Sequence, residues 1–344
     1  MEKVRVGIIG IGIGRIHLDA YKKNPKAEVL ALCDLREEET KKLAEQYGVK
    51  YVFTDYKKML EMEEIDAVSV CTPNYLHMPM TVAALEAGKH VLCEKPPARN
   101  AGEVEKMKEA VERTGKKYMT ALVQRFSAEG RYLKKLAEEG FFGEIYSAIC
   151  LWQRRKGIPG MGGWFTQKEK AGGGPVIDIG VHILDLVLYI MGYPKAVSVS
   201  AETYAKFGPY GEGVGGWGIP EAGGKFDVED LANALIRLEN GATILLQVSW
   251  ASHIESDRLG ASLQGTKAGA EWGPPRLFAD ISGQPVDIIP HLPPTDAFAG
   301  EINHFIECIL EDKEPIPNID EAMAIQRILD AIYKSAKTHK EVKV

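Results

Sequence analysis

Five short apolar runs alternate with helix-like stretches over the first third of the chain, and this alternation restricts the fold more than any other feature. Each run is apolar along its whole length, as in VRVGIIG at 4–10 and AEVLALC at 27–33. A strand that is apolar on both faces has to be covered on both sides, and strands that alternate with helices form a parallel sheet. The runs lie at 4–10, 27–33, 66–71, 89–93 and 116–123. We therefore predict a doubly wound α/β domain over residues 1–123.

Residues 124–344 show a different order of elements and predict a second domain. A helix over 128–139 is followed by strand-like runs and, near the C-terminus, by helices over 298–311 and 320–337. Strands that follow one another are typical of an α+β domain with a largely antiparallel sheet. Between two of these runs, Asn240-Gly241 predicts a hairpin with a type I′ turn. The runs are 144–153, 196–204, 231–238, 242–250 and 257–265.

Two glycine-rich stretches, 157–174 and 208–224, interrupt the second domain. Loops of that length inside a compact domain are usually functional or disordered. Composition alone does not distinguish these two cases, so the role of the stretch over 208–224 stays open.

Length and composition exclude several classes of protein. At 344 residues the chain is long enough for two domains, and its net charge of -6 argues against nucleic acid as a partner. No apolar run approaches the roughly 20 residues that span a bilayer, and the N-terminus lacks the features of a signal peptide. The five cysteines show no CxxC spacing, so they indicate neither a disulfide framework nor a zinc site. These features predict a protein of the reduced cytoplasm that binds neither nucleic acid nor membranes.

A glycine turn follows the first apolar run. Gly10, Gly12 and Gly14 stand between a predicted strand and a predicted helix, where backbone N–H groups can approach a pyrophosphate. The spacing is one residue shorter than the usual G-x-G-x-x-G, but Asp34, directly after the second run, is placed to accept the ribose hydroxyls. The pair predicts a Rossmann dinucleotide site with NAD as cofactor. Two alternatives stay open: Arg36 favours NADP, and plain turn and cap roles would need no cofactor.

Polar residues also follow the third and fourth apolar runs. Thr72-Pro73-Asn74 comes after one run, and Glu94-Lys95-Pro96 comes after the next. Ligands bind at the carboxyl ends of strands in open α/β sheets, so we expect these side chains to share one edge with Asp34.

The segments EKP at 94–96 and GGGPVIDIGVHILD at 172–185 resemble the Gfo/Idh/MocA family, named for glucose–fructose oxidoreductase and inositol dehydrogenase. The resemblance covers essentially the whole chain. It implies an N-terminal Rossmann domain and a C-terminal α+β domain whose open, largely antiparallel sheet forms dimer or tetramer contacts. It also implies an unusual, cis peptide bond at Pro96. Further matching segments are His17 after the glycine turn, TPNYLH at 72–77, QRF at 124–126 and EINHF at 301–305.

By position, the resemblance makes Lys95, Asp178 and His182 the catalytic residues. Oxidation of a secondary alcohol removes a proton from oxygen while a hydride leaves carbon, so a base and a nearby positive charge both help. His182 suits the base because its ordinary pKa is close to neutral. Asp178, four residues earlier, would share a helix face with it and orient the imidazole. The simpler interpretation, which stays open, is that His182 is a polar residue on a buried helix.

The other predicted contacts rest on the resemblance to a greater degree. Arg125 matches a position near the nicotinamide and the substrate, and Trp152 to Arg155 end a strand that points into the substrate cleft of relatives. Only alternate residues of that strand can face the cleft. The predicted cofactor-binding residues are Gly10, Gly12, Ile13, Gly14, Asp34, Arg36, Thr72, Pro73, Asn74, His77, Glu94, Lys95 and Arg125. The predicted substrate-binding residues are Lys95, Arg125, Gln153, Arg155, Trp164, Asp178 and His182.

The predicted activity is an NAD(P)-dependent oxidoreductase that interconverts a secondary alcohol and a ketone on a sugar, inositol or related polyol. The alternatives from the same family are an NAD-dependent glycosidase and a non-catalytic dinucleotide-binding regulator. We expect no metal, because no set of histidines shows ligand spacing, and we expect a homodimer or homotetramer. His17 and Asp185 are assigned to packing and hydrogen bonding.

Overall fold

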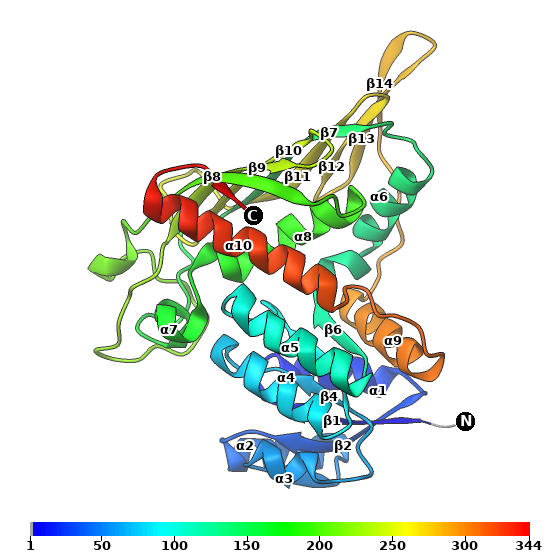
Figure 1. The fold of residues 1–344 in the computed structure, drawn as a ribbon, viewed down its shortest axis with the longest axis vertical. Helices are drawn as coiled ribbons and strands as arrows, with labels where there is room; N and C mark the ends of the chain where they lie inside the picture. The colour runs from blue at the N-terminus through cyan, green and yellow to red at the C-terminus, as the bar shows by residue number, and fades with distance from the viewer. Residues whose placement is uncertain (1–2) are drawn as a thin grey trace. The chain divides into compact units, whose positions relative to one another are not determined.

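The computed structural model describes residues 3–344 and divides the chain into two compact units (Figure 1). Unit 1 contains Met1–Val123 and Asp296–Met323, and unit 2 contains Gln124–Thr295 and Ala324–Val344. The first division falls where the sequence pattern changes. Residues 296–323 belong to unit 1 although they follow unit 2 in the sequence. They do so because the helix in that segment buries its apolar face against unit 1.

Unit 1 is built on a six-stranded parallel sheet with the order β3-β2-β1-β4-β5-β6. The order reverses between β1 and β4, which makes this the point where ligands bind in such sheets. The strand β3 is too short to stand out in the sequence pattern and was not predicted. The strands are β1 (Val4–Ile9), β2 (Ala27–Cys33), β3 (Tyr51–Phe53), β4 (Ala67–Val70), β5 (His90–Glu94) and β6 (Tyr118–Ala121).

The helices of unit 1 pack their apolar faces around this sheet. The sheet residues Val6, Val68 and Leu92 are fully buried, as expected for strands covered on both faces. The late helix α9 packs on α1 and buries Ile302 and Phe305 completely. The helices are α1 (Gly14–Lys23), α2 (Glu37–Tyr47), α3 (Tyr56–Leu60), η1 (Asn74–Leu76), α4 (His77–Glu86), α5 (Ala101–Thr114) and α9 (Ala297–Leu310).

Unit 2 contains a nine-stranded sheet with the order β14-β13-β12-β11-β7-β10-β9-β8-β15. Only β7 and β10 pair in parallel, so the sheet is largely antiparallel. Four of its strands, β12 to β15, were not predicted. The strands are β7 (Ile145–Gln153), β8 (Ala196–Tyr204), β9 (Leu231–Leu238), β10 (Thr243–Ser249), β11 (Arg258–Gly265), β12 (Ala268–Trp272), β13 (Arg276–Ile281), β14 (Gln284–Ile288) and β15 (Val342–Lys343).

The predicted hairpin between β9 and β10 is present, but its predicted turn type is wrong. Gly241 has a φ of +87°, whereas Asn240 is not among the residues with positive φ. A type I′ turn needs positive φ at both central residues. The hydrogen bond from Leu238 N–H to Ala242 O instead closes a three-residue loop with glycine at its left-handed position.

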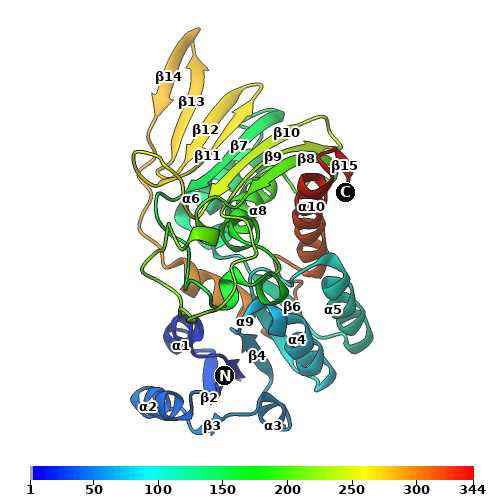
Figure 2. The ribbon, with the colours of Figure 1, turned by 90° about the vertical axis from the view of Figure 1, so that its left-hand side faces the viewer.

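Helices cover one face of the unit 2 sheet, where α8 packs on β7 and β11 and α6 packs on β12 (Figure 2). The segment Lys168–Ile190 is long and apolar enough to cross a membrane by length and composition, but 89% of its apolar window is buried inside the structure. The helical segments are η2 (Val123–Phe126), α6 (Ala128–Glu138), η3 (Trp164–Thr166), α7 (Lys168–Ala171), η4 (Val176–Gly180), α8 (Val181–Ile190), η5 (Gly208–Tyr210) and α10 (Ile319–Thr338).

The five cysteines are free and buried, as small apolar side chains are. Within residues 3–344 no group of three or more His, Cys, Asp or Glu side chains is arranged to hold a metal ion.

Candidate cofactor and active-site residues

The glycine turn between β1 and α1 leaves room and hydrogen-bond donors for a phosphate group. Gly10 has a φ of +93°, and a Cβ atom there would lie 2.3 Å from the Cys71 carbonyl oxygen. A Cβ at Gly12 would meet nothing within 4 Å. In the described part of the chain, the N–H groups of Gly12 and Ile13 have no hydrogen-bond acceptor. Gly14 begins α1, so these donors and the helix N-terminus together suit an anionic pyrophosphate.

Asp34 lies at the carboxyl end of β2 and is tied to the glycine turn. One carboxylate oxygen accepts the Ile11 N–H at 2.9 Å, and the Arg36 guanidinium donates to both oxygens at 3.0 and 3.1 Å. Burial alone would raise the pKa of Asp34, but the hydrogen bonds from Arg36 and Ile11 outweigh it and lower the pKa. Asp34 is therefore a carboxylate at neutral pH, as ribose recognition requires. Arg36 is engaged as the partner of this carboxylate.

His77 connects the loops that follow β4 and β5. Its two ring nitrogens lie 2.7 Å from the carbonyl oxygens of Thr72 and Pro96. Burial lowers the pKa of the ring, although the two carbonyls act in the opposite direction. Because both nitrogens are used on the protein's own backbone, His77 positions these loops rather than presenting its ring to a ligand. Pro73 and the buried Asn74 form the start of η1 in the same loop.

The loop after β5 carries Lys95, and the Lys95–Pro96 peptide bond is cis, as expected from the resemblance. Glu94 lies beneath it in the interior. One Glu94 oxygen accepts the Lys95 N–H at 3.1 Å, and the other is 3.0 Å from His17 Nε2. Burial would raise the pKa of Glu94, but the His17 hydrogen bond and nearby positive charges lower it. Glu94 therefore orients the start of the Lys95 loop from inside unit 1.

Glu301 on α9 is a second buried acid near Glu94. Its side chain is completely buried, and within residues 3–344 neither carboxyl oxygen has a hydrogen-bond partner. Burial, together with the charge of Glu94, raises the pKa of Glu301 well above its ordinary value. A neutral, protonated carboxyl is the state that such surroundings favour. The EINHF motif marked this position in the sequence but gave no indication of its state.

Asp178 and His182 lie on consecutive helical segments of unit 2. The sequence spacing predicted one regular α-helix, whereas Asp178 lies in the π-helical turn η4 and His182 in the first turn of α8. π-Helical turns occur frequently at functional sites. Asp178 is 5% exposed, and its Oδ2 accepts a hydrogen bond from Trp250 Nε1 at 2.9 Å. The His182 ring packs against Trp152, with 5.9 Å between the ring centroids.

The backbone of the segment before Asp178 is held by Glu229, which the sequence analysis did not find. Its carboxyl group accepts the N–H groups of Gly174 and Val176 at 2.9 and 3.1 Å and the Tyr333 hydroxyl at 2.9 Å. A Cβ at Gly174 would lie 2.0 Å from the Glu229 carbonyl oxygen, so glycine is required there. Burial raises the pKa of Glu229. No local pattern links Glu229 to a segment more than fifty residues earlier.

Arg125 was predicted to contact cofactor and substrate, but its guanidinium lies inside unit 2. It donates to both oxygens of Asp185 at 2.8 and 2.6 Å, and each side chain is 1% exposed. The ring centroids of Tyr189 and Tyr193 lie 4.7 and 5.2 Å from the Arg125 Cζ atom. We therefore assign Arg125 to the folding of unit 2, together with Asp185.

The structure also redistributes the predicted substrate contacts at the end of β7. Trp152 faces His182, so strand alternation turns Gln153 to the opposite face of the sheet. Arg155 lies past the strand end, where it is exposed and donates to the Glu255 carbonyl at 2.9 Å. Trp152 is thus the residue at this strand end that contacts His182, and the Arg154 guanidinium lies 5.7 Å from the Trp152 ring centroid. Trp164 stacks on Phe165 with 3.7 Å between ring centroids.

A parallel sheet with a phosphate-binding turn at its reversal point, together with a separate domain that carries a buried Asp–His segment, defines a two-domain dinucleotide-dependent oxidoreductase. Comparison with known families agrees. Residues 4–122 match the oxidoreductase family with an NAD-binding Rossmann fold, and residues 131–271 match the GFO/IDH/MocA C-terminal domain. The chain belongs to the Gfo/Idh/MocA family of NAD-binding oxidoreductases.

Relatives align along the full chain. D-glucoside 3-dehydrogenase from Escherichia coli K12 is 35% identical over 352 aligned positions, which cover 99% of this chain and 97% of that protein. Levoglucosan dehydrogenase in complex with NADH and levoglucosan superposes with a TM-score of 0.88 at 24% identity over 100% of both chains. Aldose-aldose oxidoreductase from Caulobacter crescentus, complexed with glycerol, gives a TM-score of 0.84 at 27% identity, also over 100% of both chains.

Proposed function

We propose that the protein interconverts a secondary alcohol and a ketone on a sugar, inositol or related polyol, with NAD as cofactor and Lys95, Asp178 and His182 as catalytic residues. The observation that carries this proposal is the buried Asp178 carboxylate, which Trp250 Nε1 fixes four residues before His182. A carboxylate held in this way can orient a nearby imidazole as a general base.

The roles of the residues follow from the charge that develops in the reaction. When bound by the glycine turn and Asp34, NAD supplies the acceptor for the hydride. His182 takes the proton from the alcohol oxygen, and Asp178 stabilises the resulting imidazolium. The Lys95 ammonium group donates to the same oxygen and favours its anionic form.

The substrate class rests on relatives. One of them is named for D-glucosides, one for levoglucosan and one for aldoses. These compounds share a ring with several secondary hydroxyl groups. We therefore infer a substrate of this kind for the present chain, without assigning which hydroxyl reacts.

The test is a panel of sugars, inositols and polyols with NAD and NADP, in which NADH formation is followed at its absorbance band. We expect NADH in proportion to the ketone formed, with NAD preferred over NADP. Lys95→Ala should abolish turnover and leave cofactor binding largely intact, whereas Lys58→Ala, at an exposed surface lysine, should change neither. Cleavage of an aryl glycoside without net NADH would instead identify a glycosidase. Cofactor binding with no turnover of any compound would identify a regulator.

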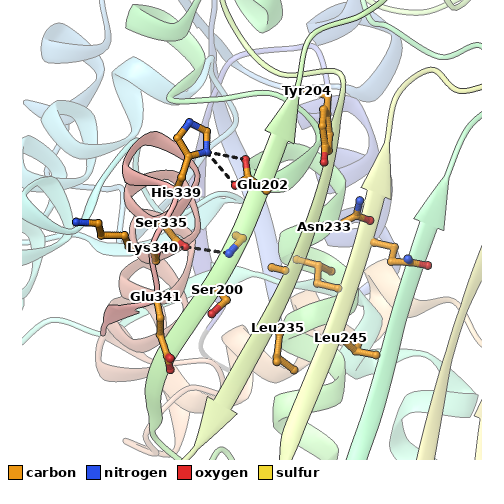
Figure 3. A pocket seen from close by; sticks show the side chains of 14 residues that line it. Ser200, Glu202, Tyr204, Asn233, Leu235, Leu245, Ser335, His339, Lys340 and Glu341 are labelled. Carbon is orange, nitrogen blue, oxygen red and sulfur yellow. Dashed lines mark hydrogen bonds and ion pairs between the residues drawn. The ribbon is translucent and has the colours of Figure 1, made fainter.

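We also propose that the protein is a cytoplasmic homo-oligomer that pairs through the uncovered face of the unit 2 sheet. Ile149, Leu245 and Leu235 form one row across three adjacent strands, and Leu245 is 46% exposed. A hollow of about 470 Å³ beside this row includes Leu235 and Leu245 (Figure 3) and none of the predicted catalytic residues. An exposed apolar row on a sheet is typical of a subunit interface.

Sedimentation analysis tests the interface. Leu245→Glu should convert the oligomer into smaller species, whereas Leu310→Glu, at an exposed leucine of α9, should leave the mass unchanged. A monomeric wild-type protein would contradict the proposal. All five cysteines are buried and free of disulfide bonds, which agrees with the proposed cytoplasmic location.

A further inference from the structure

Arg154 contacts Trp152, the residue whose ring packs against His182. Its Cζ atom is 5.7 Å from the Trp152 ring centroid and 5.4 Å from that of Trp217. The guanidinium thus lies within cation–π distance of two tryptophan rings. In the described part of the chain its side chain makes no hydrogen bond and no ion pair, and its buried Nη1 atom is unsatisfied.

An unsatisfied buried guanidinium nitrogen costs free energy unless an acceptor reaches it. The two aromatic faces already attract the positive charge of Arg154 through cation–π contacts. The unsatisfied Nη1 therefore still requires a hydrogen-bond acceptor, which a sugar hydroxyl oxygen can supply. The planar fork of a guanidinium presents adjacent donors, which match a pair of neighbouring oxygens.

The glycine-rich stretches hold Trp217 in this position. Gly160 N–H donates to the Trp217 carbonyl at 2.8 Å, and Ile158 N–H donates to the Gly213 carbonyl at 3.0 Å. In return, Gly215 N–H donates to the Ile158 carbonyl at 2.8 Å. The two loops are thus joined backbone to backbone, which explains their glycine content and the fixed place of Trp217.

The aromatic surface continues beyond Arg154. Phe165 meets Trp217 edge to face with 4.9 Å between centroids and stacks on Trp164 at 3.7 Å. Trp217 remains 38% exposed, so part of this surface faces solvent. Aromatic faces offer flat apolar area on which the C–H face of a sugar ring can pack. Donors beside such faces are what a polyhydroxylated ring needs at its rim.

We propose that Arg154 and Trp217 form a subsite for a second sugar ring, so that this enzyme prefers substrates with two sugar rings, such as disaccharides, to free monosaccharides and methyl glycosides. Trp152 separates the subsite from His182, which places the second ring next to the reacting ring. Arg154 donates to two neighbouring hydroxyl oxygens, and Trp217 packs on the apolar face. The inference rests on the proposed oxidation of sugars and extends it to the substrate class.

The test compares glucose, methyl glucoside and cellobiose as substrates of the full-length enzyme. We expect kcat/KM for cellobiose to exceed that for methyl glucoside by about tenfold or more, corresponding to one or two hydrogen bonds from a charged donor. In Arg154→Met and Trp217→Ala this preference should vanish through a higher KM for cellobiose, with kcat within about twofold of wild type. Arg154→Lys, which lacks the fork, should recover only part of the preference.

Two controls separate the subsite from general damage. Arg276→Met removes a surface arginine that pairs with Asp287, and Tyr210→Ala removes an exposed aromatic residue from the same glycine-rich stretch as Trp217. Both should keep the wild-type preference. Equal kcat/KM for methyl glucoside and cellobiose in the wild type would overturn the inference. So would a preference confined to glucuronides, because it would show that Arg154 needs an anion.

A failure of the proposed function itself gives a different result. If no sugar yields NADH, titration of tryptophan fluorescence with cellobiose still tests the subsite. Saturable quenching that is lost in Arg154→Met and Trp217→Ala would support it, and the absence of quenching in the wild type would refute it. Thermal unfolding of each variant shows whether it is folded.

Discussion

Replacement of Arg125 by methionine distinguishes a folding role from a ligand-binding role. The Arg125–Asp185 pair has both side chains at 1% exposure and two hydrogen bonds of 2.8 and 2.6 Å. Loss of one partner leaves the other charge buried, which typically costs about 3–5 kcal/mol. For a domain of roughly 200 residues, about 2–4 °C of melting temperature are lost per kcal/mol. Arg125→Met should therefore lower the melting temperature of unit 2 by about 6–20 °C.

Thermal and urea unfolding followed by circular dichroism measure this loss, and steady-state kinetics on the folded variant measure KM for NAD. The double variant Arg125→Met with Asp185→Leu should recover part of the stability, because neither charge remains. Arg131→Met, at an exposed arginine of α6, should stay within about 0.5 kcal/mol of wild type. An unchanged melting temperature in Arg125→Met combined with a raised KM for NAD would refute the folding role.

Three further predictions follow from individual contacts. Asp34→Asn should weaken NAD binding about tenfold or more in calorimetry. Because the pKa of Asp34 is lowered, its carboxylate stabilises the folded protein at neutral pH, and this stabilisation is lost as pH falls below about 3.9. Glu301→Gln should make the unfolding free energy fall less steeply between pH 5 and 8. The raised pKa of buried Glu301 lowers the stability of the wild-type protein as pH rises above ~4.3, by up to about 1.4 kcal/mol per pH unit. An unchanged slope in the variant would show that Glu301 ionises normally. Trp250→Phe removes the donor to Asp178 and should lower kcat about tenfold, whereas Trp272→Phe, whose indole nitrogen has no hydrogen-bond partner within residues 3–344, should have no effect.

Local patterns in the sequence were enough for most elements of unit 1 and for the glycine turn that follows its first strand. Apolar runs, glycines and strand-end polar residues act over a few neighbouring positions, so the Rossmann sheet, Asp34 and Lys95 could be predicted without a structure. The weakest local signals failed first. β3 has only three residues, and Asn240-Gly241 stands in a three-residue loop although the dipeptide is typical of a two-residue type I′ turn.

Contacts between distant segments could not be predicted, because each depends on how several elements pack. The return of 296–323 to unit 1 depends on the burial of one face of α9.

The same limit applies to single side chains. Glu229 binds the backbone of the segment before Asp178, which lies more than fifty residues earlier in the sequence. Arg125 forms a buried ion pair with Asp185, sixty residues later. Strand alternation, which depends on register, decides that Trp152 rather than Gln153 faces His182. The sequence by itself thus determined the family and the cofactor domain, and it supplied the candidates for catalysis. Only the tertiary structure decided which of the remaining polar side chains stabilise the fold, as Arg125 and Glu229 do, and which keep an unsatisfied hydrogen-bond donor, as Arg154 does. The reason is that burial and pairing depend on how distant segments pack.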